Sequence, residues 1–303
     1  MESTSIVITC YNQAPFIGEA INSALSQTVP AREILVVDDG STDQTGQIVG
    51  RYADVRYIHQ GNQGLVAVTR NRGIQETKGT YIVFLDGDDR LLPKHLETSL
   101  KAFQQTPHAA AVCGLFREFG EQEGIISHIC DPDDFYGMAL RFPSIAHVIT
   151  AMFKRSILAE SGNFCTDPAI NGCDDFELFL RLARRSVVHC HHELVAEHRY
   201  HSNQTTKNRA LMLKSAMTAY RYQRPYILAH PQHTEDYVRS RRAAQDFWGQ
   251  LSLNQLALSA SRGEIGVALQ YLGTLLRFFP LGLLHRICRK ALNMTIHRNQ
   301  GHS

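Results

Sequence analysis

Short apolar runs alternate with helix-like segments through the first hundred residues of the chain. Four of the runs are rich in β-branched residues and mostly apolar on both faces, as expected for strands buried inside a parallel sheet. These runs are Ser5–Cys10, Glu33–Val37, Val55–His59 and Thr80–Leu85. The segments with helical spacing between them are Phe16–Gln27, Asp43–Tyr52 and Leu65–Thr77. Strands that alternate with helices predict a parallel α/β sheet with right-handed crossovers.

The rest of the chain changes character twice. Residues 107–206 have a mixed pattern, in which Asp174–Arg185 reads as an amphipathic helix. The strand-like runs of this part are Ala109–Phe116, Val187–His191 and Leu194–Tyr200. Beyond it, long helical patterns with few strand formers follow. We therefore predict an α/β domain over 1–206, divided into halves 1–106 and 107–206, and a helical C-terminal region over 207–303.

Composition narrows the class of protein. Of the 303 residues, 44% are hydrophobic and 20% charged, which is ordinary for a soluble globular protein. A net charge of +2 without a basic stripe gives no reason to expect a nucleic-acid partner. The seven cysteines are scattered without a Cys-x-x-Cys pair, which favours reduced thiols over a disulfide framework. The first residues lack the pattern of a signal peptide, so we expect a cytoplasmic protein.

Polar side chains gather where the predicted strands end. In an open α/β sheet, ligands bind beyond the carboxyl ends of the strands. The residues at those ends are Thr9 and Tyr11, then Asp38 and Asp39, then Asp86, Asp88 and Asp89. Carboxylates gathered at one edge need a cation, a nucleobase donor or solvent to be tolerated.

The Asp86-Gly87-Asp88-Asp89 segment follows the buried run YIVFL. Carboxylate oxygens at this place suit Mg²⁺ or Mn²⁺, which take one or two carboxylates together with substrate phosphates. The alternative is a polar turn that caps the next helix, whose start is marked by Pro93.

Other residues at the same edge suit a nucleotide. Asp39 can accept the imide N–H of uracil or thymine, Tyr11 can stack on that base, and Thr9 can bond to it. The alternatives are a helix cap for the Asp39 segment and simple packing for Tyr11. Arg70, with Arg72, has the guanidinium fork that suits a diphosphate, although a solvated helix surface is the usual place for arginine.

Taken in order, four segments make the chain similar to the family 2 glycosyltransferases with the GT-A fold, over roughly residues 4–205. These segments are SIVITCYNQAPFIGEAINSALSQT, EILVVDDGSTDQT, NQGLVAVTRNRGI and GTYIVFLDGDD. The resemblance implies a UDP- or dTDP-sugar donor held against a divalent metal, Mn²⁺ or Mg²⁺. It implies that 1–106 is the nucleotide-binding half and 107–206 the acceptor half of a catalytic domain. By this likeness Thr9, Tyr11 and Asp39 hold the base, Asp86 reaches the ribose or a metal-bound water, and Asp88 binds the metal.

The segment GCDDFELFLRLA, residues 172–183, resembles the family segment that supplies the catalytic base. Asp174 stands where the family usually has Glu, and Asp175 keeps the position of the base. The alternative is a capping box formed by Asp174 and Glu177. Because Asp175 would lie in the first turn of a helix, we expect the helix dipole to keep it ionised.

The segment His198-Arg199-Tyr200-His201 resembles the Arg-x-His element that borders the phosphates and metal in some members. This likeness makes His201 a candidate metal ligand or phosphate donor, with a surface-loop histidine as the alternative.

These assignments predict an inverting, metal-dependent transfer of a sugar to an acceptor hydroxyl, in polysaccharide, lipopolysaccharide or glycolipid synthesis. The acceptor would be a saccharide or a glycolipid. A nucleotidyltransferase is an alternative, but it would need a glycine-rich, basic phosphate loop, and TCYNQAPF is not one. The retained Asp39, Asp86 and Asp88, with Asp175, argue against a second alternative, a non-catalytic nucleotide-sugar-binding protein.

Leucine, phenylalanine and basic residues alternate over Ile265–Ile296. A basic amphipathic helix can lie on an anionic membrane, which would place the protein peripherally at the inner face of the plasma membrane. The same pattern is typical of a helix that docks on the catalytic domain or on a partner subunit, and docking is the more frequent outcome.

Overall fold

The computed structural model describes residues 2–121, 123–126, 134–141, 147–202 and 204–286. The chain divides into two compact units, Met1–Gln204 and Thr205–Ser303. The last part of the predicted C-terminal helix, residues 287–296, lies outside the described residues.

One sheet organises the first unit, with its strands in the order β3-β2-β1-β4-β8-β6-β9-β5 and β7 paired with β6. The strands are β1 (Thr4–Cys10), β2 (Glu33–Asp38), β3 (Val55–His59), β4 (Tyr81–Asp86), β5 (Arg90–Leu91), β6 (Ala111–Gly120), β7 (Gly124–Ile126), β8 (Ala151–Lys154) and β9 (Val188–Tyr200). The helices are α1 (Ile17–Leu25), α2 (Thr45–Val49), α3 (Val66–Glu76), α4 (His95–Gln105), α5 (Phe135–Arg141), α6 (Arg155–Glu160) and α7 (Asp174–Ala183).

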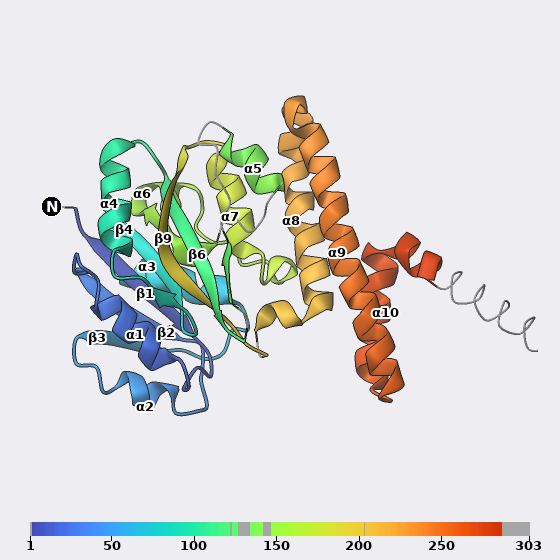
Figure 1. Ribbon diagram of the computed structural model, residues 1–303, viewed down its shortest axis with the longest axis horizontal. Coiled ribbons are helices and arrows are strands. Elements are labelled where there is room, and N and C mark those ends of the chain that lie inside the picture. The colour runs from blue at the N-terminus through green and yellow to red at the C-terminus, as the bar shows by residue number, and fades with distance from the viewer. Residues whose placement is uncertain (1, 122, 127–133, 142–146, 203, 287–303) are drawn as a thin grey trace, which may run out of the picture. The chain divides into compact units, whose positions relative to one another are not determined.

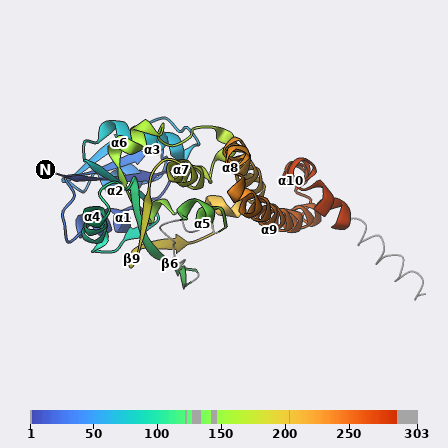
Figure 2. The same cartoon turned by 90° about the horizontal axis from the view of Figure 1, so that it is seen from above.

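The parallel core of this sheet is the part that the apolar pattern predicts. β3, β2, β1 and β4 pair in parallel, and β1 is buried along its whole length. Helices α3 and α6 cover one face of the sheet, while α1 and α4 cover the other (Figures 1 and 2). The chain moves outward from β1 to β3 and then returns to the opposite side of β1 as β4. The strand order therefore reverses between β1 and β4, and ligands of open α/β sheets bind at such a switch point.

The second half of the sheet is antiparallel in part. β8 pairs antiparallel with both β4 and β6, and β9 runs parallel to β6. The prediction of two short strands over 187–200 is wrong, because β9 is one strand of 13 residues. The register of β6 against β9 shifts between Cys113 and Leu115 and again between Leu115 and Phe116. These bulges leave His192 and Glu193 unpaired, and the pairing of the two strands continues beyond them.

The cysteines depart in one place from the expected reduced state. Cys10, Cys113, Cys165 and Cys173 are free thiols, whereas Cys190 is disulfide-bonded. Spacing along the chain did not indicate this bond, because a disulfide depends on the distance between Cα atoms in the folded protein.

The second unit is helical, as predicted, and consists in its described part mainly of α8 (Arg209–Ala229), α9 (Thr234–Ser261) and α10 (Ile265–Phe278). Asn208 directly precedes α8, and its side chain accepts a hydrogen bond from the Leu211 amide and so caps the helix. Within the described residues no single helix combines the length and apolarity needed to cross a bilayer. α10 and the helical turns Pro280–Arg286, which meet at a bend of 117°, meet these two criteria only together.

Candidate active site

The switch point between β1 and β4 brings Thr9 and Asp86 together. They are register partners, and the Thr9 hydroxyl donates a hydrogen bond of 3.0 Å to the Asp86 carboxylate. The next residue, Gly87, donates its amide to the Thr9 carbonyl at 2.8 Å. A Cβ at this position would lie 2.9 Å from the Cβ of Cys10, so only glycine fits between the two aspartates. The backbone of β1 therefore fixes where Asp86 and Asp88 stand.

Arg70 extends from α3 into the protein and is only 4% exposed. Its guanidinium donates to both oxygens of Asp86, at 2.9 and 3.1 Å, and to Asp174 at 2.7 Å. Burial acts to raise the pKa of Asp86, but the guanidinium of Arg70, together with His147 and the hydrogen bond from Thr9, outweighs this effect and holds that pKa below its usual range. Arg70 was predicted to bind the donor diphosphate, but both of its terminal guanidinium nitrogens are bonded to carboxylates of the protein.

The start of α7 differs from the predicted capping box. The residue at the N-cap is Cys173, and no side chain caps the helix there. Asp174 is 2% exposed and bonds to Arg70, whereas Glu177 pairs with Arg181 one turn later. The capping interpretation is wrong because a buried arginine offers Asp174 a stronger, charge-assisted partner than a helix amide.

Asp175 follows directly and is only partly exposed. Its carboxylate accepts a hydrogen bond of 2.7 Å from the amide of Phe176. Burial, with the charge of Asp174 as the next cause, raises the pKa of Asp175 to about 7. The expectation that the helix dipole keeps this carboxyl ionised therefore holds only in part near neutral pH, because burial and Asp174 act against ionisation. A carboxylate with this pKa is well placed to accept a proton near neutral pH.

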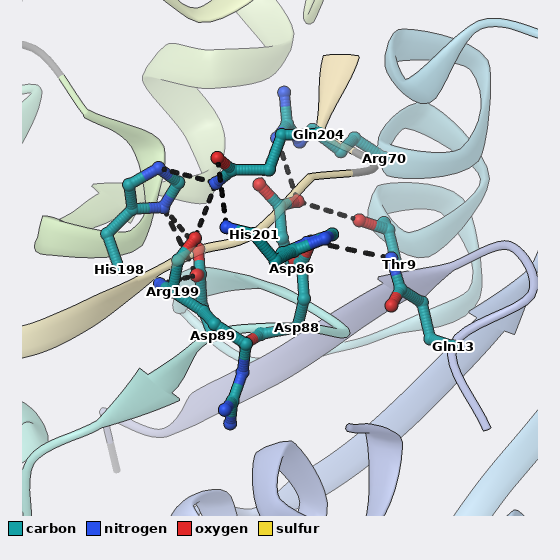
Figure 3. Close-up of polar contacts among 10 residues, drawn as sticks. All are labelled: Thr9, Gln13, Arg70, Asp86, Asp88, Asp89, His198, Arg199, His201 and Gln204. Atoms are coloured by element: carbon teal, nitrogen blue, oxygen red, sulfur yellow. Dashed lines mark hydrogen bonds and ion pairs between the residues drawn. The ribbon is translucent and has the colours of Figure 1, made fainter. Parts of the chain in front are cut away.

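Asp88 and His201 form a second polar cluster beside Asp86. The imidazole Nε2 of His201 lies 2.9 Å from the Asp88 carboxylate, and the Gln13 side-chain amide lies 3.4 Å from the same oxygen. Figure 3 shows these side chains facing each other from the ends of β4, β1 and β9. In the described part of the chain, no three His, Cys, Asp or Glu side chains are grouped so as to hold a metal ion.

Sequence reasoning missed the contacts of Asp89. This carboxylate is 1% exposed, accepts the backbone amide of Arg199 at 2.7 Å, and lies 3.1 Å from Nδ1 of His198. Burial raises the pKa of Asp89 to about 6. Burial acts to lower the pKa of His198, but the charge and hydrogen bond of Asp89, together with the charges of Asp88 and Asp86, outweigh burial and raise that pKa to about 9.

Arg199 ties the same turn to its surroundings. Its Nε donates to the Asp88 carbonyl at 2.8 Å, and its guanidinium lies over the rings of Phe16 and Phe119, 4.6 and 4.3 Å from their centres. The end of β9 therefore holds the Asp86–Asp89 turn in place (Figure 3). The only sequence signal for this contact was the resemblance at 198–201, which did not reveal the strand pairing behind it.

The residues assigned to the nucleobase, Tyr11 and Asp39, follow the ends of the neighbouring strands β1 and β2. Tyr11 is 47% exposed, so much of its side chain is accessible to a ligand. Asp39 is buried, and its carboxylate accepts bonds from the Gln60 side chain at 2.8 Å and from the amides of Gln63 and Gly64 at 3.1 and 3.2 Å. Asp39 thus holds the 60–64 segment against the end of β2.

Two groupings follow from this geometry. Thr9, Arg70, Asp86 and Asp174 form one hydrogen-bonded network, with Asp175 next to it in sequence. Asp88 and His201 lie beside it, whereas the bonds that Asp39 accepts come from 60–64. The raised pKa of Asp175 suits the removal of a proton from a hydroxyl near neutral pH.

Comparison with known sequences identifies relatives of this chain. Residues 5–162 match the sequence profile of Glycosyl transferase family 2. An uncharacterized glycosyltransferase of Rickettsia typhi is 32% identical over 210 residues, which are 67% of this chain and 65% of that protein. The chain thus spans slightly less than two thirds of that relative. The glycosyltransferase GlyG of Streptococcus pneumoniae is 34% identical over 138 residues, 44% of this chain and 46% of that protein.

Solved structures show the same fold. Residues 1–349 of S. aureus TarS, in complex with UDP-GlcNAc, superpose with a TM-score of 0.58 at 15% identity, over 88% of this chain and 89% of that one. The mannosyltransferase PcManGT from Pyrobaculum calidifontis, in complex with GDP-Man and Mn²⁺, gives a TM-score of 0.57 at 19% identity, over 91% and 87% of the two chains. The predicted GT-A-type fold with C-terminal helices is confirmed.

Proposed function

Because this chain belongs to Glycosyl transferase family 2, we propose that it transfers a sugar from a UDP- or dTDP-sugar to a hydroxyl of a saccharide or glycolipid, with inversion at the anomeric carbon. One observation carries the proposal. Arg70 joins Asp86 at the end of β4 to Asp174 at the start of α7, and this brings the candidate base Asp175 to the strand ends that bear the donor-binding candidates.

Asp175 acts as the general base. Its carboxylate removes the proton of the acceptor hydroxyl as that oxygen attacks the anomeric carbon from the face opposite the leaving nucleotide. One displacement then inverts the configuration. The raised pKa of about 7 supports this role, since it makes the carboxylate a better proton acceptor than an ordinary aspartate while leaving much of it ionised at neutral pH.

Asp88 and His201 are the residues that would hold the divalent cation, Mg²⁺ or Mn²⁺. Such ions take few protein ligands and complete their shell with phosphate oxygens and water, so a carboxylate and an imidazole 2.9 Å apart fit the requirement. When bound, the cation neutralises the diphosphate that leaves. The Gln13 amide orients the Asp88 carboxylate for this task, and Arg199 holds the Asp88 backbone through its carbonyl.

Arg70 acts as a positioning residue in this scheme. A guanidinium already bonded to Asp86 and Asp174 has little left to offer a diphosphate, so its contribution is to hold α7 and its base against β4. Asp86 remains available for the ribose because its side chain is 27% exposed.

Tyr11 and Asp39 hold the nucleobase. An imide N–H of uracil or thymine donates to the Asp39 carboxylate, which then shares its oxygens with the 60–64 segment. Guanine also presents N–H donors, and the two solved structures of this fold contain a uridine and a guanosine sugar nucleotide. The donor therefore has to be identified by experiment.

A thermal-shift panel of UDP-, dTDP- and GDP-sugars, each with Mn²⁺ or with EDTA, tests the proposal. We expect a UDP- or dTDP-sugar to raise the melting temperature in the presence of Mn²⁺, and the same donor to be hydrolysed slowly without an acceptor. Stabilisation without hydrolysis, or without transfer to any saccharide, would favour a nucleotide-sugar-binding protein. Binding of a GDP-sugar alone would refute the assignment of the base.

A further inference from the structure

Helix α10 has two apolar stripes, and only one of them is packed. Tyr271 and Leu275 are buried on the side that faces the other helices of the second unit. Ile265, Leu269, Leu272 and Leu276 form the other stripe, at the i, i+4, i+7 and i+11 spacing that places side chains on one helix face. We name these four residues the outer face of α10. Ile265, Leu269 and Leu276 are 71%, 61% and 58% exposed.

The exposed apolar surface continues beyond the helix. In the helical turns Pro280–Arg286, Leu281 is 80% exposed and Leu284 is also exposed. Single exposed leucines are ordinary on protein surfaces, but a row of them along one helix and the next turns marks a surface that another phase or molecule covers.

Charge indicates what covers it. Arg277 and Arg286 are the only Arg, Lys, Asp or Glu residues between 265 and 286, so the described part of this surface carries positive charge and no carboxylate. Arg277 is exposed and lies about a third of a turn from the centre of the outer face. Apolar side chains flanked by cationic ones are the pattern of a helix that lies in the boundary between lipid headgroups and acyl chains.

We propose that the outer face of α10 and the following helical turns bind an anionic lipid surface. The leucines enter the acyl boundary and the exposed Arg277 contacts headgroup phosphates, while Arg286, half-buried and bonded to Asn254 at 2.9 Å, adds positive charge nearby. A second copy of this chain fits less well, because a symmetric contact would pair this surface with itself and provide no carboxylate for either arginine. The proposal concerns the second unit alone and does not rest on the assigned transferase chemistry.

Vesicle flotation tests the apolar part of the proposal. Wild-type protein is mixed with vesicles of phosphatidylcholine and phosphatidylglycerol, or of phosphatidylcholine alone. We expect flotation with the anionic vesicles and less with the neutral ones. Combining Leu269→Glu with Leu276→Glu should weaken binding about tenfold or more, because two exposed leucines that enter the acyl boundary are replaced by charges.

A matched control comes from the same unit. Leu228→Glu combined with Val238→Glu adds the same two charges at exposed apolar positions in α8 and α9. We expect this variant to float like the wild type, with circular dichroism confirming that both variants are folded. If the wild type does not float, or if the two double variants bind equally, the outer face is not a membrane surface. Light scattering that shows a wild-type dimer broken only by the α10 variant, without flotation, would assign the face to a second copy.

The electrostatic part has its own test. Arg277→Gln should reduce binding to anionic vesicles about fivefold and leave binding to neutral vesicles unchanged. Arg241→Gln removes an equivalent exposed charge from α9 and serves as the control. Equal losses for both variants would overturn the assigned contact between Arg277 and the headgroups.

Discussion

The guanidinium of Arg70 bridges two carboxylates from distant parts of the chain, Asp86 at 2.9 Å and Asp174 at 2.7 Å. Removing it leaves both without their cation, and Asp174 is almost completely buried. We expect Arg70→Met to lower the free energy of unfolding by about 3–5 kcal/mol, as measured by urea denaturation.

Arg72 on the same helix provides the control. It is exposed and pairs only with Glu76 four residues later, so Arg72→Met should change stability by about 0.5 kcal/mol or less. If the two variants were equally stable, the Arg70 bridge would not hold α7 and β4 together.

Asp175→Asn should remove the proton acceptor without disturbing the donor side of the site. We expect transfer to fall by about 10²–10⁴-fold, with the dissociation constant of the donor nearly unchanged by calorimetry. Asp54→Asn, an equivalent change at an exposed turn, should behave as the wild type. Turnover by the Asp175 variant at the wild-type rate would exclude this residue as the base.

The pH dependence of transfer should report the same carboxyl group. Because the pKa of Asp175 is raised to about 7, the ionised form that accepts a proton is lost as the pH falls through 7. The rate should therefore decline on the acid side with a midpoint near 7.

Asp174→Asn removes one cause of that raised pKa, so the midpoint should move to lower pH. An unchanged midpoint in this variant would mean that another group controls the acid limb.

Metal dependence should follow Asp88. We expect EDTA to abolish transfer, Mn²⁺ to restore it, and Asp88→Asn to lose this response together with tight donor binding. His201→Asn should show a weaker form of the same defect, with the exposed His108→Asn as its control. If the Asp88 variant binds the donor as tightly and responds to Mn²⁺ as before, the cation lies elsewhere.

His198 should make stability depend on pH. Its pKa is raised from 6.5 to about 9 by Asp89, so the folded state holds this proton more tightly than the unfolded state does. The resulting stabilisation is fully present below pH 6.5 and is lost as the pH rises through 9. It amounts to at most about 3 kcal/mol.

His198→Gln keeps a hydrogen-bond donor but does not titrate, so its stability should vary less between pH 6.5 and 9 than that of the wild type. An identical slope in the two proteins, measured by denaturation at each pH, would contradict the assignment.

The parallel half of the fold was predictable because β1, β2 and β4 are buried on both faces, so each of these short runs is almost wholly apolar. The edge strand β3 is mostly exposed, and its apolar signal is correspondingly weaker. The same logic placed Thr9, Asp39 and Asp86 at neighbouring strand ends, as the register of β1 with β2 and β4 requires. The two-strand interpretation of 187–200 failed because local polarity at His192 and Glu193 reads as an interruption. Pairing with β6 across a bulge overrides that local signal.

The partners of the charged residues were not predictable. Arg70 and Asp174 are 104 positions apart, and nothing in either local pattern shows that one faces the other. Asp89 was placed only among the carboxylates at a strand end, because its contacts with His198 and Arg199 depend on the antiparallel pairing of β5 with β9. Such contacts arise from the packing of elements, and periodicity in one sequence does not contain that information.

The absence of room beside Gly87 sets a boundary for redesign. Any side chain at residue 87 would force the end of β4 away from Cys10 and break the hydrogen bond from the Gly87 amide to the Thr9 carbonyl. Asp86 and Asp88 therefore keep the same spacing in every variant of the metal or donor site. A mutant library aimed at new sugar nucleotides therefore gains nothing by varying residue 87. Its diversity is better placed at Tyr11, Gln13 and the 60–64 segment, where side chains can change without moving the sheet.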